Sequence, residues 1–130
     1  MRTIEEKIIQ ALRGWNGEDA RQLSCRDRVV VNGATKNYYL WDSLLFWSDA
    51  ENNCYFSACS FSTQTTKSRL NAILDAFFNA GIYQKNWSWF LDWNGKKYPV
   101  DSDSIFMLKD NKLYKKSSES LSSVEEVKPL

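Results

Sequence analysis

Five consecutive polar residues, Thr65-Thr66-Lys67-Ser68-Arg69, precede an amphipathic run and are the best candidate for anion binding in the sequence. The first backbone N–H groups of a helix have no partner within it, and the helix dipole adds positive charge there. Beside hydroxyls and two cations, such groups can hold a phosphate or a carboxylate. Threonines at this position are also common helix caps, which need no ligand. Because no glycine-rich loop precedes them, the segment is not a nucleotide-binding P-loop. Thr65, Thr66, Lys67 and Arg69 are therefore candidates for contact with a partner or an anion, with a simple helix cap as the alternative.

A second candidate lies at the tip of a predicted hairpin. Alternating residues lead to Trp93, Asn94-Gly95 is a strong signal for a two-residue turn, and Lys96 and Lys97 follow it. An aromatic ring beside cations is one arrangement that stacks nucleic-acid bases. Trp93, Lys96 and Lys97 are therefore candidate partner-contact residues, and an ordinary charged hairpin end is the alternative.

Other charged groups lie nearer the C-terminus. Four lysines between positions 109 and 116 can contact phosphates, although lysines on an edge strand also discourage the addition of further strands. Asp101 and Asp103 would share one side of a strand and could suit a divalent cation. A solvated turn is the interpretation that we favour for this pair.

The composition argues against an enzyme. The chain has no histidine, which removes the commonest general base and the most frequent metal ligand. Cys25, Cys54 and Cys59 are an odd set without C-x-x-C spacing, and three cysteines without histidine make a poor zinc site. We expect reduced thiols, no metal and no cofactor.

Charge and hydropathy limit the remaining classes of function. The net charge of +1 lowers the expectation of non-specific nucleic-acid binding. Aromatic residues make up 15% of the chain, with six tryptophans, and can serve either a core or an interface. No apolar run is long enough to span a membrane, and the N-terminus lacks the apolar run of a signal peptide. We therefore expect a cytoplasmic protein that does not enter a membrane.

The first half of the chain predicts one helix followed by strands. Thr3 and Glu6 form a capping box, apolar residues then recur at helical spacing, and Gly14 and Gly17 end the helix. Three or four antiparallel strands follow, with a hairpin turn at Asn32-Gly33. Their predicted ranges are 28–31, 37–42, 44–48 and 54–58.

The second half predicts a helix and then more strands. Thr65 or Thr66 caps a helix with a wide apolar stripe, and Gly81 ends it. Strand-like segments follow at 82–93, 96–100, 105–108 and 113–114. We expect one α+β domain over residues 1–116, with two main helices and an antiparallel sheet of several strands, and a flexible tail over 117–130.

Several segments occur together in a distinctive order: YYLW at 38–41, TTKSRLNA at 65–72, IYQK at 82–85 and WSWFL at 87–91. They resemble a small domain of unknown function found in bacteriophage and other mobile-element proteins. That domain has a turn carrying an aromatic, a T-T-K/R-x-R-L-N-A-L helix start and a later Q-K…W-Y-L strand. Phe61 stands where its tryptophan is expected. The resemblance implies a phage-like origin and a compact α+β fold, and it supplies no catalytic residues.

A small mobile-element protein without a catalytic site is typical of an inhibitor that covers a working surface of the host. We expect a phage anti-defence protein that binds a host protein or nucleoprotein complex, for example an anti-CRISPR bound to a Cas effector in the host bacterial cytoplasm. The alternative is a nucleic-acid-binding accessory protein, whose affinity would fall steeply with salt. It would use the start of the second helix and the Trp93–Lys97 hairpin.

Overall fold

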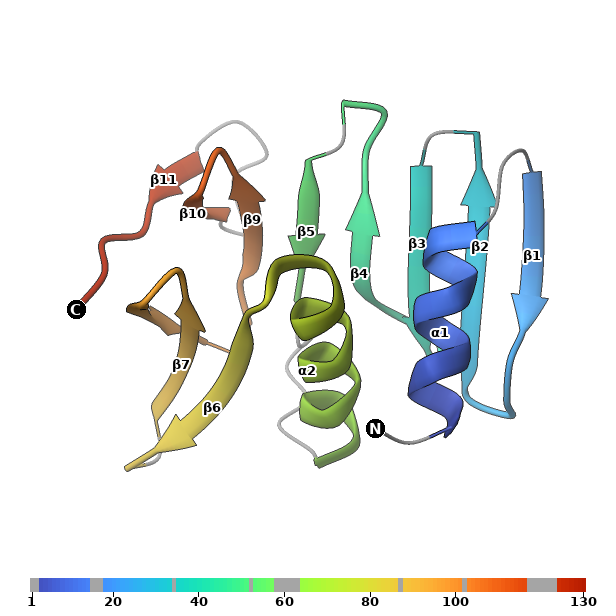
Figure 1. The fold of residues 1–130 in the computed structure, drawn as a ribbon, viewed down its shortest axis with the longest axis horizontal. Coiled ribbons are helices and arrows are strands. Elements are labelled where there is room, and N and C mark those ends of the chain that lie inside the picture. Colours follow the sequence, from blue (N-terminus) through green and yellow to red (C-terminus); the bar gives the residue numbers. More distant parts are fainter. Residues whose placement is uncertain are drawn as a thin grey trace.

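The computed structural model describes residues 3–14, 18–33, 35–51, 53–57, 64–86, 88–101, 103–116 and 124–130. Within these ranges the chain forms two helices and two antiparallel sheets, which confirms the predicted α+β class (Figure 1). The helices are α1 (Thr3–Gly14) and α2 (Gln64–Phe78). The strands are β1 (Glu18–Gln22), β2 (Asp27–Asn32), β3 (Thr35–Leu40), β4 (Ser43–Ser48), β5 (Cys54–Phe56), β6 (Gly81–Lys85), β7 (Ser88–Trp93), β8 (Lys96–Val100), β9 (Ile105–Lys109), β10 (Lys112–Lys116) and β11 (Val124–Glu126).

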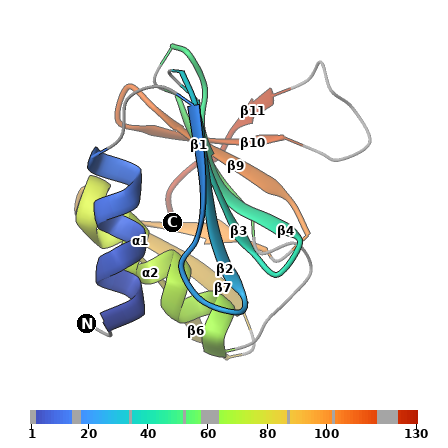
Figure 2. The same ribbon diagram turned by 90° about the vertical axis from the view of Figure 1, so that its right-hand side faces the viewer.

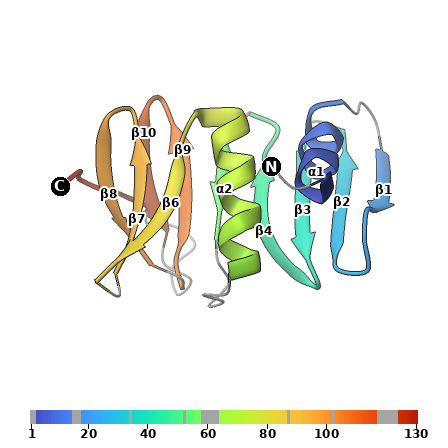
Figure 3. The same ribbon diagram turned by 60° about the horizontal axis from the view of Figure 1, so that its bottom comes forward.

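The larger sheet has eight strands in the order β1-β2-β3-β4-β5-β9-β10-β11. All of its neighbouring strands are antiparallel, and all but one pair of neighbours are also consecutive in the chain. The exception is β5, which pairs antiparallel with β9 and so connects the two halves of the chain. The segment between them supplies α2 and a separate three-stranded sheet in the order β6-β7-β8. Figure 3 shows α2 between β4 and β6, so this helix bridges the two sheets.

Both helices pack on the same face of the eight-stranded sheet (Figure 2). Alternate strand residues face them, because successive side chains in a strand point to opposite faces. Directly paired residues form a buried row across five strands: Val29, Tyr38, Phe46, Phe56 and Phe106. The helices add their apolar stripes to the same core, which includes Ile8, Leu12, Leu70, Ile73 and Leu74.

The tight turns predicted at Asn94-Gly95 and Asp110-Asn111 are confirmed, whereas Asn32 of the turn predicted at Asn32-Gly33 is the last residue of β2 and pairs with Thr35. Gly33, Asn94, Gly95, Asp110 and Asn111 all have positive φ, the conformation that two-residue hairpin turns require. Asn and Asp adopt it with less strain than other side chains, because their short polar groups bond locally. Pro99 lies on β8, an edge of the smaller sheet, as its missing N–H donor requires.

Several predicted boundaries are wrong. The second helix begins at Gln64, so Thr65 and Thr66 lie inside its first turn and are not its cap. It ends at Phe78 with Asn79 at φ 54°, and Gly81 is the first residue of β6. The single strand expected over 82–93 is two strands that turn near Asn86. Strand β1 was not predicted, because its sequence EDARQ carries no apolar alternation.

The prediction of a flexible tail over 117–130 is wrong for residues 124–130. Strand β11 pairs with β10, and the N–H of Val127 donates to the carbonyl of Leu113 at 2.8 Å. The N–H of Leu130 donates to the carbonyl of Lys97 at 2.7 Å, which ties the end of the chain to β8. Backbone hydrogen bonds hold this polar segment, and its composition gave no sign of them. Residues 117–123 lie outside the described part of the chain.

Candidate functional site

Arg69, one of the predicted anion-binding residues, lies in the core. Its side chain is only 1% exposed, and its Nε donates to Oδ1 of Asp27 at 2.9 Å. A second guanidinium nitrogen lies 3.4 Å from Oε2 of Glu5 on α1. The buried hydroxyl of Tyr38 donates to the same oxygen of Asp27. Arg69 therefore links α2 to α1 and β2, and its burial contradicts the prediction that it contacts an external anion.

The carboxylate of Asp27 stays ionised within this cluster. Burial acts to raise its pKa, but hydrogen bonds from Arg69, Ser24 and Tyr38 together outweigh that effect and hold the pKa below its usual range. Burial and the hydrogen bond to Asp27 raise the pKa of Tyr38 far above that of a free tyrosine. The cluster is a fully occupied structural network, so neither Asp27 nor Tyr38 is placed as a general acid or base.

The remaining predicted residues at the start of α2 line two different hollows. Thr66 is 2% exposed, and Thr65 and Thr66 line a small cavity beside the β3–β4 turn. Lys67 instead lines an open hollow together with Glu5 of α1 and with Asn71 and other residues of α2. The segment therefore does not gather its hydroxyls and cations around one anion.

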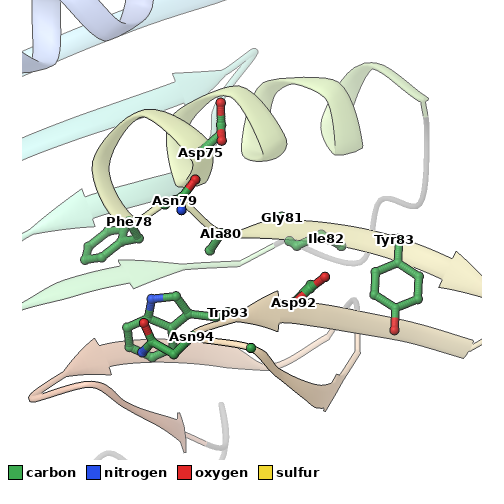
Figure 4. A pocket seen from close by; sticks show the side chains of 11 residues that line it. Asp75, Phe78, Asn79, Ala80, Gly81, Ile82, Tyr83, Asp92, Trp93 and Asn94 are labelled. Atoms are coloured by element: carbon green, nitrogen blue, oxygen red, sulfur yellow. The ribbon is translucent and has the colours of Figure 1, made fainter.

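The predicted hairpin site is divided in the same way. Trp93 is 4% exposed and packs edge-on against Phe78 with ring centroids 6.2 Å apart. In Figure 4 it lies at the C-terminal end of α2, beside Asn94. Lys96 and Lys97 are exposed, and the ammonium of Lys97 lies 5.9 Å from the ring centroid of Tyr83. Burial contradicts the prediction that Trp93 stacks on a partner.

The two predicted sites also lie at opposite ends of α2. A helix rises about 1.5 Å per residue, so the 11 residues from Lys67 to the end of α2 at Phe78 span roughly 16 Å. A single phosphate-binding surface built from Lys67 and the Lys96-Lys97 pair is therefore not formed.

The other polar candidates have structural roles. The carboxylate of Asp101 accepts the N–H groups of Asp103 and Ser104 and pairs with Lys115 at 2.9 Å, so this stretch is the expected turn. Among the described residues, no group of three potential metal ligands comes together. Cys25 is an exposed free thiol, and burial raises the pKa of Cys54 to about 11. None of the described helices is long and apolar enough to cross a membrane.

The face of the eight-stranded sheet opposite the helices is the most distinctive surface. Directly paired residues form an outward row that is half-buried on six strands and ends on an exposed glutamate: Val30, Asn37, Trp47, Tyr55, Met107, Tyr114 and Glu126. At about 4.8 Å between strands, the row is roughly 29 Å long. The solvated face of an antiparallel sheet is normally polar. Here four adjacent strands instead present Trp47, Tyr55, Met107 and Tyr114, which we call the aromatic stripe.

Two contacts organise this face. The rings of Trp47 and Tyr55 stack at 5.4 Å between centroids with an interplanar angle of 9°. The hydroxyl of Tyr55 donates to Asp49, whose carboxylate also accepts the backbone N–H groups of Glu51 and Asn53. Beside the stripe, the guanidinium of Arg28 lies 4.6 Å from the ring centroid of Tyr39. Contacts within the chain thus hold the rings in place, and preorganised side chains of this kind lose less entropy on binding.

The stripe was missed although the sequence carried a signal for it. Phe46-Trp47, Tyr55-Phe56, Phe106-Met107 and Leu113-Tyr114 are adjacent apolar pairs within strands. Because neighbours in a strand point to opposite faces, each pair must place one large side chain outward if the other enters the core. The register that aligns these outward residues across four strands is set by the long-range pairing of β5 with β9.

The fold and this face define a small α+β protein with half-buried aromatic side chains on the outer face of its larger sheet. Residues 1–115 match the family model described as Kyanoviridae Gp96 protein, and the chain belongs to this family. It is a bacteriophage family of unknown function, which confirms the resemblance to a phage domain. No curated protein and no solved structure matches the chain.

Proposed function

We propose that this phage protein is a non-enzymatic inhibitor that binds a protein complex of host defence in the host cytoplasm, in the manner of an anti-CRISPR protein. The aromatic stripe is the observation that carries the proposal. Tyr and Trp supply large contact areas at low conformational cost and are enriched among the residues that dominate protein–protein binding. A contiguous apolar surface of this kind on a small protein marks an interaction site.

Charge favours a protein partner over a nucleic acid on this face. The stripe has the carboxylate of Asp49 bonded to Tyr55 within it and Glu126 at its end. Both would repel phosphates. Lys112 lies on the same face of β10 as Tyr114 and is already paired with Glu126, whereas Lys115 points to the opposite face, where it pairs with Asp101. Phosphate binding would have to break the pair of Lys112 and Glu126, whereas apolar contact leaves it intact.

The proposal of a non-enzymatic role is supported by the state of the buried carboxylates. Asp27 and Glu5 are both held by Arg69. A candidate general base must have a free oxygen in reach of a substrate. Asp27 instead faces the core between α1, α2 and β2, and Glu5, which lies at the edge of the hollow beside Lys67, is 4% exposed with its Oε2 bonded to Ser68 and Arg69.

The test is a rescue assay in bacteria that carry a defined defence system, joined to affinity capture of the tagged protein with and without nuclease. We expect expression to restore plating of a restricted phage and to capture the defence complex after nuclease treatment. Met107→Lys should abolish both, because it places a charge in the middle of the stripe while its unbranched stem keeps the local packing. Tyr83→Lys is the matched control, since it places the same charge next to a stacked ring on the smaller sheet. Tyr83 stacks with Phe90 there, as Trp47 stacks with Tyr55 in the stripe.

Three results would count against the proposal. Failure to rescue phage from any system tested, with no defence complex captured, would overturn it. Capture that disappears on nuclease treatment would favour nucleic-acid binding instead. Equal loss of activity in the Met107 and Tyr83 variants, with both folded by circular dichroism, would show that the stripe is not the contact.

A further inference from the structure

The turn between β3 and β4 exposes an unusual tryptophan. Trp41 is 64% exposed, by far the most exposed of the described aromatic residues, and it follows directly on the buried Leu40. Its backbone N–H donates to the carbonyl of Arg26 at 2.6 Å, which fixes the turn against the segment before β2. The ring is therefore displayed from a backbone that is itself anchored.

The backbone of Trp41 is also strained. Six non-glycine residues among those described have positive φ, and five of them are Asn or Asp. Trp41, at φ 56°, is the sole bulky one. Large side chains avoid this region because Cβ approaches the following carbonyl oxygen. Strain retained at an exposed position motivates a search for a function of that residue.

A cavity of about 300 Å³ lies beside this ring. Buried Leu40 and Leu45 line it with exposed Trp41, and Ser43 and Thr65 add hydroxyl groups. This volume lies at the lower end of the range for ligand sites, which suits one large apolar side chain. The cavity opens on α2 and the β3–β4 turn, so it is a different surface from the aromatic stripe.

Arg26 is the charged residue among those that line the cavity. It is exposed, and its guanidinium makes no ion pair or ring contact with any residue that the structure describes. Asp42, the neighbour of Trp41 in the turn, is exposed but does not line the cavity. An apolar cavity with a free guanidinium is complementary to an apolar group that carries a carboxylate close by.

We propose that this cavity receives one large apolar side chain of a partner protein, with an adjacent partner carboxylate on Arg26 and with Trp41 covering the side chain. This second contact rests on the proposed function, because it assumes a protein partner. It adds specificity to the contact with the stripe, since a cavity accepts one shape and the guanidinium selects one charge. It also gives a reason for the strained tryptophan at the turn.

The cavity can be tested without the partner, so its failure is separate from failure of the proposed function. The probes are N-acetylphenylalanine, which has a ring and a carboxylate, and its neutral amide. Binding is followed by NMR on the ¹⁵N-labelled full chain, in which Trp41→Gly identifies the indole N–H signal of Trp41. The indole signal of Trp89, on the smaller sheet, is the internal control.

We expect the acid to shift the Trp41 indole and the amides of Ser43 and Thr65, with no shift at Trp89. The amide probe should bind about threefold more weakly, the ratio expected for one exposed ion pair. Arg26→Gln should remove that difference without changing binding of the amide, and it leaves the backbone carbonyl that anchors Trp41 in place.

Absence of any shift up to the solubility limit of the acid would overturn the proposal. Equal binding of the two probes to the unmodified protein would remove the role of Arg26 and so overturn it as well. Tighter binding of single-stranded oligothymidylate at the same indole would show that the cavity serves base stacking instead.

Discussion

Replacing Arg69 with methionine removes the guanidinium that separates two buried carboxylates, while keeping most of the apolar volume of the side chain. Asp27 is 0% and Glu5 is 4% exposed, so both would lose their common cation without gaining water. Removing one partner of a buried ion pair lowers the free energy of unfolding by about 3–5 kcal/mol. Proteins of this size are stable by roughly 5–15 kcal/mol, so the loss is a large fraction of the total. The expected fall in melting temperature is about 10–20 °C.

The same variant has a characteristic pH dependence. In the unmodified protein the folded pKa of Asp27 lies below its unfolded value, so this group stabilises the fold above about pH 4 and the contribution is lost as pH falls through the folded pKa. Without Arg69, burial would instead raise the folded pKa of Asp27, and protonation would relieve the destabilisation. The stability difference between the two proteins should therefore be largest near neutral pH and shrink towards pH 3.

Urea unfolding followed by circular dichroism measures this difference at each pH. Lys67→Met on the same helix is the control, because Lys67 lies at the surface hollow and should change stability by less than about 0.5 kcal/mol. Arg69→Met combined with Asp27→Asn should recover part of the loss, since the two residues are coupled. A cost below about 1 kcal/mol for Arg69→Met, or a pH-independent difference, would refute the reasoning.

Other predictions concern the turn, the thiols and the C-terminal segment. Trp41→Gly should be about 1 kcal/mol more stable than Trp41→Ala by urea unfolding, because glycine accepts positive φ; the opposite order would show that the turn differs in solution. In a Cys59→Ser background at pH 8, a thiol reagent should modify exposed Cys25 much faster than Cys54, whose pKa is about 11, and equal rates would contradict the burial of Cys54. Deleting residues 124–130 should lower the melting temperature and speed amide exchange at Leu113, whose strand loses its β11 partner; unchanged exchange would show that the segment is not docked.

The sequence by itself determined the elements that rest on local chemistry. The helix over Thr3–Gly14 follows from its apolar spacing, and the hairpin turns follow from Asn-Gly and Asp-Asn pairs that tolerate positive φ. The antiparallel α+β class followed from the order of these elements, and the phage character followed from a resemblance carried by the TTKSRLNA motif.

Tertiary structure alone decided which of the candidate residues reach the surface. Arg69 and Trp93 have the chemistry of binding residues, but a carboxylate from β2 and rings from α2 and β8 enclose them in the core. Asp27 lies 42 residues from Arg69, and Phe78 of α2 lies outside the hairpin that carries Trp93 and Tyr98, so no local pattern could show the burial. The aromatic stripe has the same origin, because it exists only where β5 joins β9 and aligns outward residues from both halves of the chain. Local sequence sets the conformation of each segment, and long-range packing sets what each side chain faces.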